Sequence, residues 1–274
     1  MRPIGRESPM PIEKLPDGRI NAGLWCLNAN IPSYDFGAYC ITLRTLNIKS
    51  LFFRYREPLH SNKFPPQMAW NRFRHLLIPL AELSGIRWVM IPEVSGEFAP
   101  RITAYGHFCQ MHEMTGGRVH MWEAPYKWDD SNYVTITLRK SHAGWQPARD
   151  SNLPEWEKVR EELLKRGKKV VVVNDAEEEC ISVRDRMALY AGADMNLGVN
   201  TGPMMLCHFS KAPYLTFKMI PETEPERTHI RENLEISKFP IGGQFPWAHA
   251  KQRMVWETDT AETIIKHYDE VMGC

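Results

Sequence analysis

The feature that most constrains this chain is the alternation of apolar and helix-like segments that begins at Tyr133. The strand-like segments are YVTITLR (133–139), KKVVVVND (168–175), DMNLGVN (194–200) and APYLTFK (212–218). The helix-like segments between them are LPEWEKVREELLKRG (153–167), DRMALYAGA (185–193) and PMMLCHFS (203–210). Parallel strands are usually joined by helical crossovers, so four strands separated by three helices predict a doubly wound parallel sheet.

Segment 153–167 carries the clearest helical signal. Its apolar residues fall three and four apart on one face, namely Leu153, Trp156, Val159 and Leu163. Asn152 precedes this face and Glu155 follows three residues later, which is the spacing of a capping box. Gly167 suits the left-handed residue that ends many helices. We therefore expect a helix that is capped by Asn152 and packed on the sheet.

The next segment, KKVVVVND, is an unbroken apolar run with polar ends. Parallel strands that are covered on both faces typically contain such runs, whereas strands with one solvent-exposed face alternate between apolar and polar residues. We therefore expect residues 168–175 to form a strand that is buried on both faces.

The N-terminal half has a similar rhythm. Strand-like INAGLWCLN (20–28), SLFFRYR (50–56) and IRWVMIP (86–92) alternate with helix-like DFGAYCITLRTLN (35–47) and QMAWNRFRHLLIPLAELSG (67–85). At the other end of the chain, TDTAETIIKHYDEVMG predicts a closing helix with Thr260 or Asp259 near its cap. We expect an α/β fold with two Rossmann-like doubly wound domains, the N-terminal one reduced. The expected boundaries are a leader at 1–18, an N-terminal domain at 19–128 and a C-terminal domain at 129–274.

Composition excludes several classes of protein. The 34 Lys and Arg against 33 Asp and Glu leave a net charge of +1, so no overall field favours nucleic acid or an anionic membrane. No window approaches the ~18 consecutive apolar residues of a membrane span. The six cysteines are scattered and form no CxxC pair, which favours reduced thiols. We therefore expect a cytoplasmic protein that binds no nucleic acid, with peripheral membrane contact left open.

A sharp corner joins the strand 194–200 to the helix-like segment that follows it. Its residues are Asn200, Thr201, Gly202, Pro203 and Met204. Ligands of doubly wound sheets bind outside the carboxyl ends of the strands, where this corner falls. Gly202 permits close approach of a ligand, Pro203 suits the first helical turn, and the N–H groups of Met204 and Met205 are expected to face an anion such as a diphosphate. The same residues also make a good turn without any ligand, so both interpretations stay open.

Charged and polar residues follow two other predicted strands. Arg139, Lys140 and Arg149 lie in the loop after the first strand of the C-terminal half. The planar fork of arginine matches phosphate oxygens, so Arg139 at a strand end predicts a diphosphate contact, whereas Lys140 is more simply a solvated lysine. Asn174 and Asp175 end the next strand, in a position for ribose hydroxyls or a base edge, although aspartate also caps helices.

Several of these motifs resemble a known family. The run DRMALYAGADMNLGVNTGPMMLCHFSKAPYLTF resembles the nucleotide-binding half of GT-B-fold glycosyltransferases, notably heptosyltransferases, with their Ala-Gly-Ala-Asp and Asp-Thr-Gly-Pro-Met motifs. YVTITLRKS resembles the arginine-bearing strand end of fucosyltransferase-like GT-B enzymes, and QRMVWETDTAETIIKHY resembles the terminal helix that closes the fold. The resemblance covers the chain from residue 131 onward. Asn200 stands where heptosyltransferases carry Asp, so the sugar is left open.

The resemblance implies transfer of a sugar from a nucleotide-diphosphate donor to a hydroxyl acceptor, with no obligatory metal and no cofactor beyond the donor. Domain 129–274 would hold the donor, and domain 19–128 a glycan, lipid-linked or small-molecule acceptor. Such a reaction needs a general base, for which Asp35 is the first candidate and Glu93 the second. Asp35 also suits a helix cap. A non-catalytic nucleotide- or glycan-binding module and a nucleotide-sugar epimerase remain as alternatives.

Two metal-like motifs are better interpreted as ordinary structure. HFCQMHE offers His107, Cys109 and His112, but this spacing matches no closed zinc set. WDD places Asp129 and Asp130 in the expected linker, where a solvated turn is the simpler interpretation. No GxGxxG follows the first strand and no P-loop or GxSxG motif occurs, which argues against dinucleotide oxidoreductases and P-loop enzymes. We therefore expect no metal site.

Overall fold

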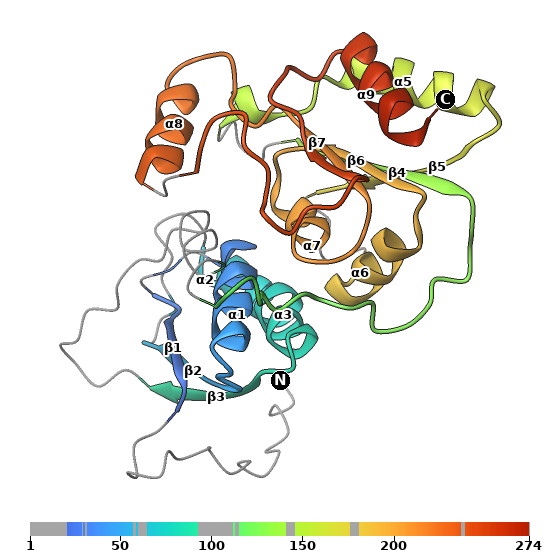
Figure 1. The fold of residues 1–274 in the computed structure, drawn as a ribbon. Coiled ribbons are helices and arrows are strands. Elements are labelled where there is room, and N and C mark those ends of the chain that lie inside the picture. Colours follow the sequence, from blue (N-terminus) through green and yellow to red (C-terminus); the bar gives the residue numbers. More distant parts are fainter. Residues whose placement is uncertain are drawn as a thin grey trace. The chain divides into compact units, whose positions relative to one another are not determined.

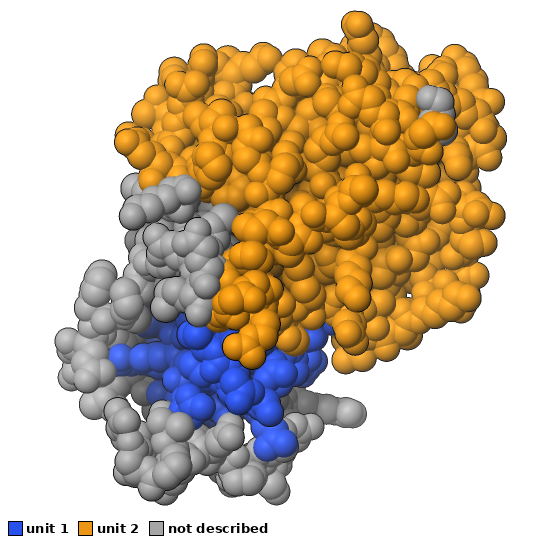
Figure 2. Space-filling view, in the orientation of Figure 1, with its two compact units in different colours: residues 1–102 blue, residues 103–274 orange. Residues whose placement is uncertain are grey.

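The computed structural model describes residues 21–28, 30, 32–56, 59, 65–92, 112, 115–140, 146–175, 181–236 and 239–273. The chain forms two units, residues 1–102 and residues 103–274 (Figure 2). The division therefore falls between 102 and 103 rather than between 128 and 129. Trp122 belongs to the second unit because its N–H donates to Phe209 O (2.7 Å) and it forms an isolated bridge with Ser210. The expected leader, 1–18, lies outside the described residues.

The N-terminal unit contains a three-stranded parallel sheet. Its strands are β1 (Gly23–Cys26), β2 (Ser50–Tyr55) and β3 (Arg87–Pro92), in that order across the sheet. Helix α1 (Asp35–Thr45) follows β1, and α2 (Pro66–Arg72), η1 (Phe73–Leu77) and α3 (Ile78–Leu83) join β2 to β3 (Figure 1). Phe53 of β2 contacts Phe36 of α1 and Phe73 of η1, with ring centroids 5.3 and 4.9 Å apart. These helices therefore pack on one face of the sheet, and the expected βαβαβ pattern is confirmed.

The helix expected over 67–85 is a continuous helical segment with a π-helical turn in its middle. This turn, η1, comes directly before the segment that contains Pro79. Proline has no N–H, and its ring clashes with the carbonyl four residues earlier, here that of His75 within η1. A π turn at this point relieves the clash, since π bulges occur where the regular helical hydrogen-bond ladder is interrupted.

The C-terminal unit contains a five-stranded parallel sheet in the order β5-β4-β6-β7-β8. The strands are β4 (Tyr133–Leu138), β5 (Lys169–Asn174), β6 (Met195–Val199), β7 (Tyr214–Phe217) and β8 (Gln252–Met254). The chain moves from β4 to β5 on one side and then returns to the other side of β4 with β6, which makes the sheet doubly wound. The expected α/β fold with two Rossmann-like units, the first of them reduced, is confirmed.

The two faces of this sheet have different interiors. Helices α5 (Leu153–Lys165) and α9 (Ala261–Met272) cover one face, and α6 (Val183–Gly192) and α7 (Met205–His208) cover the other (Figure 1). The core under α5 and α9 is apolar and consists of Val134, Ile136, Trp156, Val159, Leu163, Met195, Leu197, Val199, Leu215, Phe217, Val255, Ile264 and Tyr268. On the other face Thr135 Oγ1 donates to Asn196 Oδ1 (2.7 Å), and the hydroxyls of Thr137 and Tyr190 share a hydrogen bond of 2.7 Å. That face is therefore held by buried hydrogen bonds as well as by packing.

The packed face of α5 is confirmed except at Leu153, which is 43% exposed, but the predicted cap is wrong. The Asn152 side chain makes no cap bond, and its N–H donates instead to Asp259 Oδ2 (2.8 Å). Glu155 does not complete a capping box, because its Oε2 accepts a hydrogen bond from Ala261 N–H (2.8 Å) at the start of α9. The first turns of α5 and α9 are thus held by each other's flanking residues.

Strand β5 is not buried on both faces, contrary to the prediction from its valine run. Among the described strands it pairs with β4 alone and forms one edge of the sheet. Val173 is buried, whereas Val172 is 43% exposed. The composition of a strand says that both faces are apolar, but it does not say whether neighbouring elements cover them.

The sequence did not predict helix α8 (Glu226–Ile236) or strand β8, and the helix expected at 203–210 is shorter. It consists of a 3₁₀ turn, η4 (Gly202–Met204), followed by α7. The segment before β8 runs along the second edge of the sheet. Gln244 Nε2 donates to Met254 O (2.8 Å), and Met254 N–H donates to Gln244 Oε1 (2.7 Å). A side-chain amide thus satisfies the backbone of β8 at that edge.

One expectation from composition, that of reduced thiols, is reflected in the described residues. Cys26, Cys40 and Cys207 are buried free thiols, as their scattered spacing suggested. No helix in the described ranges is long and apolar enough to cross a bilayer.

His208, at the end of α7, is buried under the sheet. Its Nε2 and Thr216 Oγ1 share a hydrogen bond of 2.9 Å, and its ring lies 4.8 Å from that of Tyr214 between centroids. No described residue bonds its Nδ1. Burial lowers the pKa of His208 to about 3, so the folded chain holds the imidazole in its neutral form.

We expect acid to destabilise the fold through His208. An unfolded histidine has a pKa of about 6.5, so below that pH the unfolded chain binds a proton that the folded chain refuses down to about pH 3. This residue should therefore lower the free energy of unfolding by up to ~1.4 kcal/mol per pH unit in this window, and contribute nothing above it. Urea titrations of the wild type and His208→Gln between about pH 7 and about pH 4 measure this contribution. Equal pH slopes in the two proteins would contradict it.

Candidate functional site

The carboxyl ends of β4 and β6 form the switch point of the five-stranded sheet, where ligands of doubly wound folds bind. Each described strand end near this point is followed by a charged or polar residue. Arg139 follows β4, Asp175 follows β5, Asn200 follows β6 and Lys218 follows β7. The topology therefore brings residues that lie far apart in the sequence to the carboxyl ends of neighbouring strands.

The corner after β6 is held on several sides. Asn200 N–H donates to Phe217 O (3.0 Å), and Asn200 Nδ2 donates to Met219 O (3.3 Å). Arg149 donates from Nη2 to Asn200 O (3.0 Å) and from Nη1 to Gln146 Oε1 (2.8 Å). The structure therefore brings Arg149 and Asn200 together, as a common site requires.

Arg139 lies beside the same loop. Its side chain is 12% exposed, and its Nε is 3.3 Å from Asp150 Oδ1. Arg139 N–H donates to Ser151 Oγ (2.9 Å), and Ser151 N–H donates to Arg139 O (3.0 Å), so the backbone at this strand end is fixed. A guanidinium has five N–H donors, which allows it to bind Asp150 and phosphate oxygens together. Lys140 is exposed, as expected for a solvated lysine.

A short hydrogen bond links the end of β5 to the corner across β4. Thr201 Oγ1 donates to Asp175 Oδ2 (2.6 Å), and Asp175 N–H continues the ladder by donating to Leu138 O (2.8 Å). Asn174 contributes its carbonyl, which accepts from Arg186 Nη2 of α6 (3.1 Å). Asp175 and Thr201 thus act as one unit, and Asn174 anchors the helix that follows.

The backbone amides expected to face an anion are engaged internally. Met204 N–H donates to Thr201 O (3.1 Å), and Met205 N–H donates to Gly202 O and Pro203 O. The prediction that these two amides are free is therefore wrong, because the 3₁₀ turn uses them in its own hydrogen bonds. Pro203 and Met204 are buried and pack the corner. An anion here would meet side chains before these amides.

Close packing of this corner requires Gly198 in β6. A Cβ at Gly198 would lie 3.0 Å from Met204 Sδ and 3.1 Å from Thr137 O, closer than most side-chain contacts allow. This glycine is not among the site residues predicted from the sequence. Its signal was a glycine inside an otherwise apolar strand, which often marks close approach of another chain segment.

Lys218 is the main site residue that sequence reasoning missed. It follows β7 directly, as Arg139 follows β4, and its backbone adopts a left-handed conformation with φ of 52°. Its Nζ donates to Asp150 O (2.9 Å) and lies 3.4 Å from Asp259 Oδ1. A lysine in this conformation is uncommon, and such residues cluster at functional sites. The signal was present in YLTFK, where a cation ends a buried strand.

A buried carboxylate anchors this lysine. Asp259 is 1% exposed, and its Oδ2 accepts hydrogen bonds from Asn152 N–H and Trp156 Nε1, both at 2.8 Å. Asp150 lies between the two cations, with its Oδ1 near Arg139 and its carbonyl on Lys218. Arginine and lysine are therefore held at the strand ends by carboxylates, in positions from which both can also bind an anion.

The structure describes one of the two candidate bases, Asp35. Asp35 is exposed at the first turn of α1, directly after the loop that follows β1. It is not the cap of that helix, because Tyr34 occupies the cap position, but its Oδ2 accepts from Ser33 Oγ (2.9 Å). Glu93 lies outside the described residues.

The structure describes only part of the two motifs, HFCQMHE and WDD, that the sequence suggests are ordinary structure rather than metal sites. His107 and Cys109 lie outside the described residues, and the ring of His112 packs near Trp247 at 6.0 Å between centroids. Asp130 pairs with Lys169, which lowers the pKa of that carboxyl. Within the described ranges, no group of three His, Cys, Asp or Glu side chains is placed to hold a metal ion.

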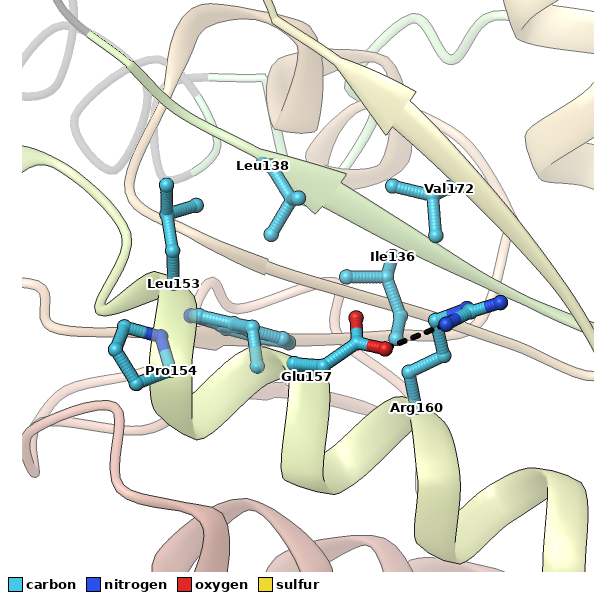
Figure 3. A pocket seen from close by; sticks show the side chains of 8 residues that line it. Ile136, Leu138, Leu153, Pro154, Glu157, Arg160 and Val172 are labelled. Carbon is cyan, nitrogen blue, oxygen red and sulfur yellow. Dashed lines mark hydrogen bonds and ion pairs between the residues drawn. The ribbon is translucent and has the colours of Figure 1, made fainter.

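A separate apolar cavity of about 420 Å³ lies between α5 and the β4–β5 edge of the sheet (Figure 3). Its walls are Ile136, Leu138, Leu153, Pro154, Trp156 and Val172. Glu157 and Arg160, three residues apart on α5, pair with each other at its rim. The cavity is on the α5 face and carries few polar groups, so it is unsuited to a diphosphate.

Comparison with known proteins gives solved structures alone. No protein-family model and no curated protein matches the sequence. The chain is similar to E. coli heptosyltransferase WaaC with ADP, at 10% identity and a TM-score of 0.43, over 91% of this chain and 99% of that one. WaaC with ADP-2-deoxy-2-fluoro heptose gives 12% identity and a TM-score of 0.41 over the same shares.

A third similar structure is the bacterial iron-containing dodecameric glycosyltransferase TibC from enterotoxigenic E. coli. It matches at 12% identity and a TM-score of 0.37, over 72% of this chain and 57% of that one. All three structures are glycosyltransferases, the class of enzyme that the sequence resembles.

Proposed function

We propose that this protein is a glycosyltransferase that moves a sugar from a nucleoside-diphosphate donor to a hydroxyl group of an acceptor. The proposed donor site lies at the carboxyl ends of strands β4, β6 and β7 in the C-terminal sheet. The observation that carries the proposal is the convergence of three cations from two segments: Arg149, in the loop after β4, bonds the corner at Asn200 O, and Arg139 of the same loop and Lys218 after β7 both bond Asp150.

The chemistry of transfer explains why such cations are needed. When the bond between the anomeric carbon and the diphosphate breaks, negative charge develops on the departing phosphate oxygens. Fixed cations stabilise that charge, and because carboxylates already position them, little reorganisation is required. Arg139 and Lys218 supply this charge, which removes the need for a metal ion at the diphosphate. In this proposal Asp175 and Thr201, which share a hydrogen bond of 2.6 Å, bind the ribose hydroxyls.

Nucleoside diphosphates are expected to stabilise the protein against heat, and Arg139→Ala or Lys218→Ala should remove most of that effect. A ligand at about one hundred times its dissociation constant adds roughly 2.7 kcal/mol to stability. For a unit of this size that corresponds to a melting-temperature rise of roughly 5–10 °C. The measurement is a thermal-shift panel of GDP, UDP, ADP, CMP and NAD on the wild type and both variants.

Lys211→Ala is the matched control for Lys218→Ala. Lys211 is an exposed lysine just before β7, at the amino ends of the strands, whereas the proposed donor site is at their carboxyl ends. Its removal should therefore leave the ligand-induced shift unchanged. If no nucleoside diphosphate raises the melting temperature of the wild type, or if NAD alone does so, the proposal is overturned.

A further inference from the structure

Asn200, directly after β6, is a buried amide next to the turn that carries Lys218. The residue is 6% exposed. Its backbone N–H donates to Phe217 O (3.0 Å), which continues the ladder between β6 and β7, and its side-chain Nδ2 donates to Met219 O (3.3 Å). Phe217 and Met219 are the residues directly before and after Lys218. Asn200 therefore holds the carbonyls on both sides of this lysine.

The backbone conformation of Lys218 requires such support. Its φ of 52° is left-handed, and this region is unfavourable for residues that carry a Cβ, with asparagine and aspartate as partial exceptions. A third hydrogen bond adds to the two from Asn200, because Lys218 N–H donates to Glu257 O (3.0 Å). The value of φ sets the direction in which the side chain leaves the strand end. The bonds that hold this turn therefore also decide where the ammonium group lies.

We propose that Asn200 is a positioning residue of the donor site, which acts on the diphosphate through Lys218 and not by contact. This inference rests on the proposed function. The turn held by Asn200 directs Lys218 Nζ to Asp150 O (2.9 Å) and to a point 3.4 Å from Asp259 Oδ1, from which it meets the departing phosphate. Without the Nδ2 donor, Met219 O loses its bond. Lys218 then relaxes toward an extended backbone, which carries the ammonium away from the donor.

The contacts of Asn200 with the two cations differ in kind, which makes the inference testable. Asn200 O accepts from Arg149 Nη2 (3.0 Å), and this bond uses the backbone, as does the bond to Phe217 O. The bond to Met219 O uses the side chain. A substitution at position 200 keeps the backbone N–H and carbonyl and removes the Nδ2 donor. Its effect is therefore expected at Lys218 and not at Arg149.

Calorimetric titration of the full chain with GDP, UDP and ADP tests this role in a double-mutant cycle. Lys218→Ala should weaken binding of the diphosphate that the wild type binds by about 10- to 100-fold, as expected when a charge-assisted hydrogen bond is lost. Asn200→Leu keeps a branched side chain of similar size without the donor, and it should weaken binding by a comparable factor. Added to Lys218→Ala, it should weaken binding by no more than about twofold, because no lysine remains to be positioned.

Asn196→Leu is the matched control, because it removes another buried amide from the same strand. Asn196 is 0% exposed, and its Nδ2 donates to Tyr190 O (2.9 Å) and Pro213 O (2.7 Å), but it lies near the amino end of β6. This variant should lower the melting temperature and leave the affinity for the diphosphate unchanged. Asn200→Ala repeats the test at position 200 with a smaller side chain, in case Asn200→Leu does not fold.

The outcomes separate this inference from the proposed function. If the variants of Asn200 bind the diphosphate as tightly as the wild type while Lys218→Ala binds it weakly, the inference alone is overturned. It is also overturned if Asn200→Leu weakens binding equally with and without Lys218, because the amide then acts independently of the lysine. A wild type that binds none of the three diphosphates overturns the proposed function, and this inference with it.

Discussion

Asp35→Asn is expected to lower sugar transfer by about 10²- to 10⁴-fold, which is the usual contribution of a general base. Under the proposed function, attack by the acceptor hydroxyl requires a group that takes its proton, and a carboxamide cannot do so. Asp35 is exposed at the start of α1 and is held by Ser33 Oγ (2.9 Å), so its carboxylate is both accessible and positioned. The measurement is release of nucleoside diphosphate from UDP-, GDP- and ADP-sugars with a panel of glycan and lipid acceptors.

Binding and a neighbouring carboxylate provide the controls for this variant. The thermal shift produced by the nucleoside diphosphate should be the same in Asp35→Asn as in the wild type, because the proposed donor site consists of residues of the C-terminal unit alone. Glu82→Gln should keep full activity, since Glu82 is an exposed carboxylate on α3, which leads into the start of β3 rather than following a strand end. If Asp35→Asn transfers sugar at the wild-type rate, Asp35 is not the base. Glu93 then becomes the candidate.

The sequence predicted those features of the fold that depend on local patterns. Helix α5 buries the face formed by Trp156, Val159 and Leu163, and Thr260 caps α9 by accepting from Thr263 N–H (3.2 Å). Hydrophobic periodicity and cap chemistry act over a few residues, so they can be read from one segment at a time. The alternation of such segments then predicts the parallel sheet.

Features set by distant partners could not be read in this way. The N–H of Asn152 donates to Asp259, 107 residues away, and Glu155 serves Ala261 instead of its own helix. The valine run of β5 is apolar on both faces, yet the strand order places it at an edge. Both outcomes depend on which elements become neighbours, and local sequence does not specify this.

The candidate site shows the same division. Arg139, Arg149, Asp175, Asn200 and Thr201 were chosen because they follow predicted strands, and the structure links them through Asp150, Gln146 and the corner backbone. The amides of Met204 and Met205 were misjudged because the local helix type decides their hydrogen bonds. Lys218 was missed although it obeys the same strand-end rule, because its role depends on Asp259 from the following segment.

Asp259→Ala is expected to cost about 3–5 kcal/mol of unfolding free energy, the range seen when one partner of a buried ion pair is removed. The carboxylate is 1% exposed and serves three donors on two elements: Asn152 N–H, Trp156 Nε1 and Lys218 Nζ. Its removal leaves the buried indole N–H of Trp156 without an acceptor, at a cost of about 1–3 kcal/mol, and frees the part-buried N–H of Asn152 beside a largely buried ammonium. Asp259→Asn should cost less, because the amide oxygen still accepts hydrogen bonds.

The matched control for this prediction is Glu257→Ala, two residues earlier. Glu257 is 55% exposed and pairs with His267 at 2.8 Å, and surface pairs of this kind contribute about 1 kcal/mol or less. Urea unfolding of the three variants and the wild type gives the comparison. An Asp259→Ala variant no less stable than Glu257→Ala would mean that water or a rearranged side chain replaces the carboxylate. The position of Lys218, and with it the charge at the proposed donor site, would then not depend on Asp259.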